Sequence, residues 1–223
     1  MTHSEIFKES SCSFRQCQPE DADASVPLLL SSGPALYRYV FSIAHKEQAA
    51  EFAHFCFCKK RGQLSHTQHT AAIVDGVQVG VVGLSIHRKR FEYFWAGVFT
   101  IFSFYGFFSG LLVAYRGLRL ESILRPSRND VGLIYNFGVH EGVRGRGIGQ
   151  GILEHMYLRS RKFGLKRVGL DVSQENPRAR ALYERQGFVG REENLSSLKS
   201  KYGSLGTHHY MERPAHLDLQ RDD

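Results

Sequence analysis

Residues 140–156 read HEGVRGRGIGQGILEHM, and they carry the most informative pattern in the chain. Four of the seven residues from Gly145 to Gly151 are glycines, and a run of helix-forming residues follows directly. The apolar residues of that run are spaced four apart, at Ile148, Ile152 and Met156. This spacing predicts a helix with one buried face. Buried-strand patterns at residues 133–139 and 167–172 flank it, so we expect a strand–loop–helix–strand unit with parallel strands.

A glycine-rich turn that leads from a strand into a helix presents unpaired backbone N–H groups at the positive end of the helix dipole. Such a turn is a binding site for phosphate, and Arg144 and Arg146 add positive charge beside it. The nucleotide P-loop requires a lysine after its second glycine, and no lysine occurs between Lys89 and Lys162. The dinucleotide pattern GxGxxG also fails, because its last position holds glutamine, isoleucine or glutamate in every register.

Two motifs of known spacing do occur. The first is R-x-x-G-x-G, formed by Arg144, Gly147 and Gly149, and the second is NPRARALYERQGF at residues 176–188. With these motifs, residues 133–189 resemble the GNAT superfamily of N-acetyltransferases. The resemblance implies a single α/β domain over residues 1–223, with a mixed, mostly antiparallel sheet flanked by helices. It also implies that the strands at 133–139 and 167–172 splay apart to admit acetyl-CoA.

The resemblance assigns the acetyl-CoA contacts. The loop amides would bind the pyrophosphate, and the N–H groups of Gly138 and Val139 would polarise the thioester carbonyl. Asn176 would hydrogen-bond acetyl-CoA, cap its own helix, or do both. The complete set is Gly138, Val139, Arg144, Gly145, Arg146, Gly147, Ile148, Gly149, Gln150 and Asn176.

The implied reaction is direct attack of a primary amine on the thioester. Tyr183 matches the tyrosine that relatives use as general acid, and the resemblance implies this role; the alternative is an aromatic ring packed between helix and sheet. The general base stays open, because the strand at 133–139 carries no Asp or Glu. A water chain could serve, and the nearby candidates are Asp171, Glu175, Tyr135 and His140.

Residues 93–115 form an uncharged apolar stretch between basic flanks, which is long enough for a membrane span. A span here would put strands of one sheet on opposite sides of a membrane. We therefore expect a helical insertion over residues 89–128, a buried hairpin or lid broken near Gly97, Gly106 or Gly110. Its phenylalanines are predicted to line an apolar acceptor pocket or a dimer face; they include Phe99, Phe102, Phe104, Phe107 and Phe108.

The rest of the chain predicts a strand at Phe14–Cys17, three helices between residues 19 and 60, and a last strand at Thr207–Arg213. A β-hairpin over residues 70–86 turns at Asp75 and Gly76. We expect loose ends at residues 1–13 and 217–223.

The composition indicates what the chain binds and where it works. The net charge of +7 favours an acidic partner but does not identify it, and the resemblance implies acetyl-CoA rather than nucleic acid. The four cysteines form no disulfide framework or zinc pattern, and the first residues lack the pattern of a secretory signal, so we expect a cytoplasmic enzyme without a metal. We expect no membrane partner, because a span at residues 93–115 would divide the sheet that the resemblance implies. The acceptor is expected to be a small-molecule amine, and a homodimer is possible. The alternatives are a non-catalytic acyl-CoA sensor and a basic nucleic-acid-binding module.

Overall fold

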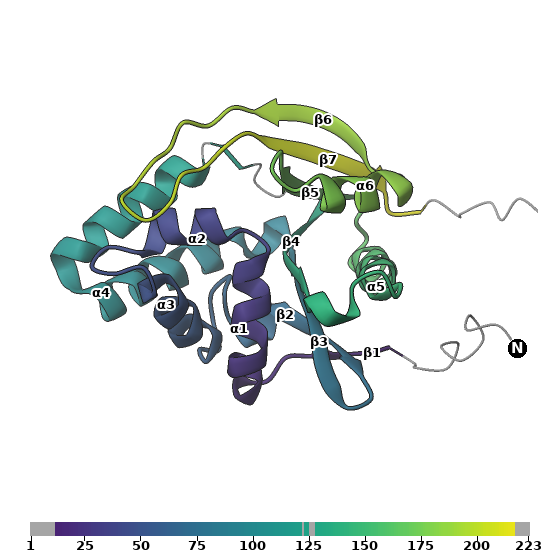
Figure 1. Cartoon of the computed structure of the whole chain (residues 1–223), viewed down its shortest axis with the longest axis horizontal. Coiled ribbons are helices and arrows are strands. Elements are labelled where there is room, and N and C mark those ends of the chain that lie inside the picture. The colour runs from purple at the N-terminus through teal and green to yellow at the C-terminus, as the bar shows by residue number, and fades with distance from the viewer. Residues whose placement is uncertain (1–11, 122, 125–127, 217–223) are drawn as a thin grey trace, which may run out of the picture.

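The computed structural model describes residues 12–121, 123–124 and 128–216. A seven-stranded sheet in the order β1-β2-β3-β4-β5-β7-β6 forms the centre of the molecule (Figure 1). The strands are β1 (Ser13–Gln16), β2 (His69–Val74), β3 (Val77–Ser85), β4 (Val131–Val139), β5 (Arg167–Ser173), β6 (Val189–Asn194) and β7 (His208–Pro214). The expected loose ends lie outside the described residues except for Cys12 and Ser13. Ser13 already belongs to β1, so the expectation of a loose segment is wrong there.

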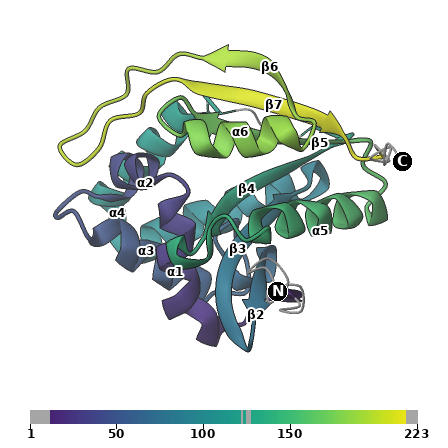
Figure 2. The same ribbon diagram turned by 45° about the vertical axis from the view of Figure 1, so that its right-hand side comes forward.

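Helices cover both faces of the sheet. One face packs against α1 (Ala22–Ser31), α2 (Pro34–Phe41) and α3 (Gln48–Phe57), with Ala71 and Val81 of the sheet in their core. The opposite face packs against α5 (Ile148–Lys162) and α6 (Pro177–Arg185) (Figure 2). The predicted stripe of α5 is confirmed, because Ile152 and Met156 are fully buried in that second core.

Among the strands of the described residues, only β4 and β5 are parallel neighbours, and every other neighbouring pair is antiparallel. Their ladder runs from Val131↔Arg167 to Ile134↔Leu170 and stops there. Beyond this point β4 pairs only with β3, and β5 pairs only with β7. The predicted α/β fold and its splayed parallel pair are therefore confirmed, with the splay beginning after Ile134.

The β2–β3 hairpin also follows the prediction. Asp75 and Gly76 both have positive φ, 51° and 78°, as a type I′ turn requires. Aspartate and glycine are among the residues that adopt this conformation at low cost.

The predicted insertion is α4 (Arg90–Glu121), and the chain breaks its helical path at Gly106, where φ is 71° and ψ is −176°. We call the result the α4 hairpin, with a first arm at residues 90–105 and a second arm at 107–121. Both arms reach the end of α2: the Tyr105 hydroxyl donates to the Phe41 carbonyl at 2.6 Å, and Arg116 donates to the Ser42 carbonyl at 3.1 Å. The predicted break at Gly106 is confirmed.

The expectation that this insertion is buried is wrong. Counted as one continuous helix, α4 from Phe91 to Glu121 has the length and apolar composition of a membrane span, yet only 11% of its apolar window is buried. Tyr93 and Val113 face the domain, whereas Phe99 and Phe108 are 77% and 85% exposed. The periodicity of the sequence did not predict the exposure of the outer face, because α4 is apolar on its outer as well as its inner face.

Candidate functional site

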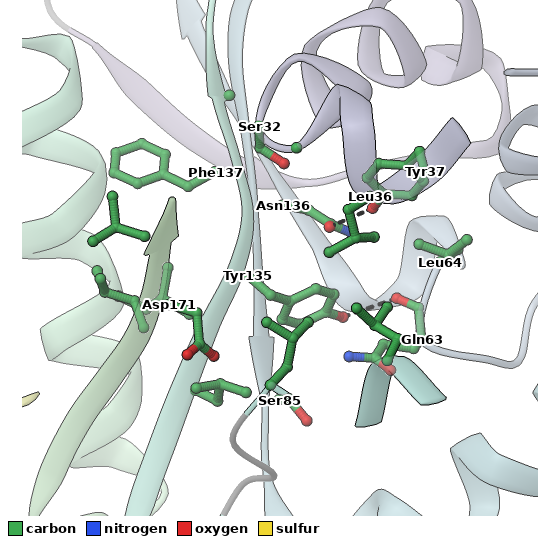
Figure 3. A pocket seen from close by; sticks show the side chains of 18 of the residues that line it. Ser32, Leu36, Tyr37, Gln63, Leu64, Ser85, Tyr135, Asn136, Phe137 and Asp171 are labelled. Carbon is green, nitrogen blue, oxygen red and sulfur yellow. Dashed lines mark hydrogen bonds between the residues drawn. The ribbon is translucent and has the colours of Figure 1, made fainter. Parts of the chain in front are cut away.

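A cavity of about 1470 Å³ extends across the molecule from the glycine-rich loop to the α4 hairpin. It passes through the opening between β4 and β5, where Tyr135 and Asp171 border it, and Figure 3 shows both residues there. The residue at the α1–α2 junction, Ser32, and the loop residue Gln63 border the same space. The splayed strands and the loop therefore open into one continuous site.

The loop has the geometry of a phosphate site. Gly145 and Gly147 have φ of 83° and 80°, and Gly147 is the N-cap residue of α5. A Cβ atom on either glycine would meet no protein atom within 4 Å, so the space in front of the loop is open. Helix geometry leaves the first N–H groups of α5 without helical partners at this opening. The loop thus fits the pyrophosphate that the sequence predicted, and glycine is required at both positions by the backbone conformation itself.

The other loop residues divide by location. Arg144, Gly149 and Gln150 border the cavity, whereas Arg146 is exposed outside it and Ile148 packs against the α5 core. The Nε of Arg144 donates to the Val139 carbonyl at 3.0 Å. This hydrogen bond ties the loop to the end of β4. A Cβ on Gly149 would lie 3.1 Å from Leu182, which adds a packing reason for that glycine.

β4 carries a bulge just before Gly138 and Val139. The register with β3 shifts between Val81 and Gly83, which gives β4 one extra residue, and Asn136 there has φ of 53°. Gly138 and Val139 both border the cavity. A Cβ on Gly138 would lie 2.0 Å from the carbonyl oxygen of Leu28, so glycine lets α1 approach this part of the strand.

A directional chain of hydrogen bonds holds the bulge. The Tyr37 hydroxyl donates to Asn136 Oδ1 at 2.5 Å (Figure 3), and Asn136 Nδ2 donates to His69 Nε2 at 3.0 Å. His69 Nδ1 in turn donates to the Ser65 carbonyl at 2.8 Å. Burial lowers the pKa of His69 to about 4 and raises that of Tyr37, so both side chains are neutral at pH 7. The sequence did not predict this series of hydrogen bonds. Its one sequence signal is an asparagine, Asn136, inside a largely apolar strand.

Tyr183 lies in α6 and borders the cavity. Its ring packs 6.2 Å from that of Phe137 and 5.8 Å from that of Phe188, so the packing interpretation holds as well. Burial raises the pKa of Tyr183, and the hydroxyl therefore keeps its proton at neutral pH.

Asn176 is placed at the start of the same helix. It caps α6, its Oδ1 accepting from the Ala179 N–H at 3.1 Å, and it borders the cavity too. The capping role that the sequence predicted is confirmed, and a contact to acetyl-CoA remains compatible with it.

The structure separates the four candidates for the general base. Tyr135 and Asp171 border the cavity, whereas Glu175 lies outside it and His140 accepts from the Gly142 N–H at 3.2 Å, capping a turn. The Tyr135 hydroxyl donates to the Gln63 carbonyl at 2.9 Å, and burial raises its pKa well above the usual value. A neutral tyrosine whose proton is engaged is a poor base. Of the four candidates, Asp171 is the one that brings a carboxylate to the cavity, which also borders Glu121 at its α4 end.

The inner faces of the α4 hairpin form the apolar end of the cavity. Both arms contribute, with Val98 and Ile101 from the first and Val113 and Ala114 from the second. The phenylalanines named from the sequence do not border it; those of α4 that do are Phe91 and Phe94. Among the described residues, no group of three or more His, Cys, Asp or Glu side chains has a geometry that could hold a metal ion.

Comparisons with known proteins match this geometry. The model of the acetyltransferase (GNAT) family matches residues 34–188. A mycothiol acetyltransferase of Beutenbergia cavernae is 47% identical over 58 residues, which are 26% of this chain and 20% of that protein. A 5-NmdU N-acetyltransferase of Pseudomonas phage PaMx11 is 35% identical over 63 residues, 28% of this chain and 43% of that protein. The chain thus matches less than half the length of these curated relatives.

Solved structures share the fold over most of the chain. An N-acetyltransferase from Staphylococcus aureus Mu50 superposes with a TM-score of 0.66 at 15% identity, covering 90% of this chain and 100% of that one. The ribosomal-protein-S18-alanine N-acetyltransferase from Escherichia coli gives a TM-score of 0.53 at 14% identity, covering 95% and 98%. The family model spans more than half of the chain. The chain belongs to the acetyltransferase (GNAT) family.

Proposed function

We propose that the protein transfers an acetyl group from acetyl-CoA to the primary amine of a small-molecule acceptor. The observation that carries the proposal is the continuous cavity, which joins the open glycine loop to an apolar compartment through the gap between β4 and β5. One end of this cavity fits the phosphates of a nucleotide cofactor, and the other fits a second substrate with an apolar part.

Acetyl-CoA supplies an activated acetyl thioester, whose carbon–sulfur bond is exchanged for a carbon–nitrogen bond. The loop at residues 144–150 binds its phosphates through backbone amides, and the backbone of Gly138 and Val139 lies beside the acetyl group. Since β4 has no β5 partner along this stretch, its β5-facing backbone groups are available to a ligand. Asn176 lies at the rim of the same cavity, where its amide can contact the cofactor.

We assign the proton transfers to two side chains that border the cavity. Asp171 accepts the proton that the amine nitrogen loses when it bonds to the acetyl carbon. Tyr183 holds a proton at neutral pH and donates it to the departing sulfur, so that the products are an acetamide and a free thiol. Neither residue needs a metal for this role.

The acceptor class follows from the compartment that α4 encloses. Its walls are apolar on both arms, so amines with an aliphatic or aromatic portion fit it better than small polar amines. An assay of thiol release with a panel of amines tests the proposal: apolar primary amines should give acetylated products by mass spectrometry. Binding of acetyl-CoA without product from any amine would favour the non-catalytic sensor instead.

A further inference from the structure

The outer surface of the α4 hairpin exposes many apolar side chains. Ten of the fifteen large apolar side chains exposed in the described part of the chain lie on α4, and seven of these ten do not border the cavity. In the first arm these are Trp95 and Phe99, four residues apart, and in the second they include Phe108, Leu111 and Tyr115. Contiguous exposed apolar surface of this kind marks an interaction site.

The hairpin is too short to cross a bilayer. Each arm has about 15 residues, or about 23 Å at the α-helical rise, against about 30 Å of hydrocarbon. Tyr93, at 8% exposed, and Val113, at 0%, also anchor the inner faces to the domain. The outer face can therefore enter only the surface layer of a membrane while the rest of the domain stays in water.

Positive charge lies around the first arm. Lys59, Lys60 and Arg61 are exposed, and the next residue, Gly62, approaches Ala96 of that arm, where an added Cβ would lie 3.9 Å from the Ala96 Cβ. The exposed Arg88 and Lys89 precede the arm directly in the chain. The acidic residues of α4 are confined to its two ends, at Glu92 and Glu121. Basic residues beside an apolar aromatic face complement a membrane that carries anionic lipids.

From this arrangement we propose that the outer face of the α4 hairpin docks the enzyme on the surface of an anionic bilayer. This goes beyond the transfer reaction and differs from the expectation, drawn from the sequence, that no membrane is involved. A second copy of the chain would match the apolar residues, but its own cations would meet the same cations across a symmetric contact. The charge pattern therefore favours lipid over a dimer.

Trp95 gives a direct readout, because it is the single tryptophan of the chain and lies on this face, 55% exposed. The intact protein is titrated with vesicles of phosphatidylcholine and phosphatidylserine, and with vesicles of phosphatidylcholine alone. The proposal predicts a blue shift of the Trp95 emission and co-sedimentation with the anionic vesicles, weakened by salt. Absence of both would overturn it.

Matched variants locate the binding surface. The substitution of the exposed pair at the tip, Phe107→Asp/Phe108→Asp, should weaken vesicle binding by about tenfold or more, since it removes two apolar side chains that would enter the bilayer and adds negative charge. The control Val77→Asp/Leu195→Asp changes two apolar residues that are 63% and 77% exposed elsewhere, and should bind as the unaltered protein does. Lys60→Glu/Lys89→Glu should reduce binding to anionic vesicles only.

Two other results would contradict the proposal. If Phe107→Asp/Phe108→Asp and the control Val77→Asp/Leu195→Asp lost vesicle binding equally, the α4 face would not be the specific binding surface. A blue shift that grows with protein concentration without vesicles, together with dimers in sedimentation velocity, would assign the face to a second copy instead. Neither readout depends on catalytic activity, so the result is independent of the proposed reaction.

Discussion

Tyr135 of β4 and Asp171 of β5 are the first residues beyond the last paired register of the two parallel strands, Ile134↔Leu170. Ile134 and Leu170 point together into the α5 core, so the alternation of strand side chains directs Tyr135 and Asp171 to the opposite side. Both border the cavity there. The point at which the sheet opens is thus also the point at which it presents a carboxylate.

Replacing this carboxylate tests the proposed base. Asp171→Asn keeps the side-chain shape and removes the proton acceptor, so kcat should fall by about 10²-fold at neutral pH. The deficit should narrow at alkaline pH, where more of the amine is already neutral. Glu175→Gln, a similar change outside the cavity, should leave the pH profile of kcat unchanged. Identical profiles for Asp171→Asn and the unaltered enzyme would exclude Asp171 as the base.

The proposed acid is tested with a matched pair of tyrosines. Tyr183→Phe keeps the ring contacts with Phe137 and Phe188 but removes the donor, so kcat should fall by about 10²-fold while the affinity for acetyl-CoA changes little. Tyr157→Phe serves as control, because Tyr157 lies in the same core but does not border the cavity. An unchanged kcat in Tyr183→Phe would leave this residue with a packing role only.

Asn136 carries both the bulge conformation and two hydrogen bonds, and two substitutions separate these roles. Asn136→Gly tolerates φ of 53° but loses the bonds to Tyr37 and His69, whereas Asn136→Ala loses the bonds and adds strain. The free energy of unfolding should therefore be about 1 kcal/mol lower for the alanine variant than for the glycine variant. Equal denaturant midpoints would show that the backbone at residue 136 is not strained.

The buried His69 makes stability depend on pH. The pKa of His69 is about 4 in the folded protein, against 6.5 for an exposed histidine such as that of the unfolded chain. Between pH 4 and pH 6.5 the unfolded chain therefore binds more protons than the folded protein. The stability that the neutral imidazole contributes is complete above pH 6.5 and is lost as the pH falls toward 4, by about 3 kcal/mol if the full shift is realised. His69→Gln should show a shallower decline in this window, measured by urea unfolding at each pH. If the unfolding free energies of His69→Gln and the unaltered protein declined in parallel with falling pH, groups other than His69 would cause the pH dependence.

The sequence was sufficient where local chemistry determines the structure. The turn at Asp75–Gly76, the glycine loop before α5 and the cap at Asn176 each depend on neighbouring residues, and all were predicted. The splayed strands came from the family resemblance, not from periodicity.

The features of the site that the sequence did not predict depend on contacts between segments far apart in the chain. The hydrogen bond from Tyr37 to Asn136 joins residues 99 positions apart, and the one from Tyr135 to Gln63 joins residues 72 apart. No local pattern predicts either contact. The exposure of α4 was not predicted for a related reason. An apolar residue in the sequence predicts burial, but it does not show whether the protein core or another surface covers the side chain.

The central claim is that the glycine loop and the splayed strands bind acetyl-CoA, and calorimetric titration of the protein with acetyl-CoA tests it most directly. Gly147→Glu should reduce the affinity by about tenfold or more, because it places a negative side chain in front of the phosphate site. Gly76→Glu is the control, since its φ of 78° and open surroundings match the 80° and open space at Gly147. Saturable binding that is lost in Gly147→Glu and kept in Gly76→Glu is the predicted result. No binding by the folded, unaltered protein, or equal binding by all three proteins, would contradict the account.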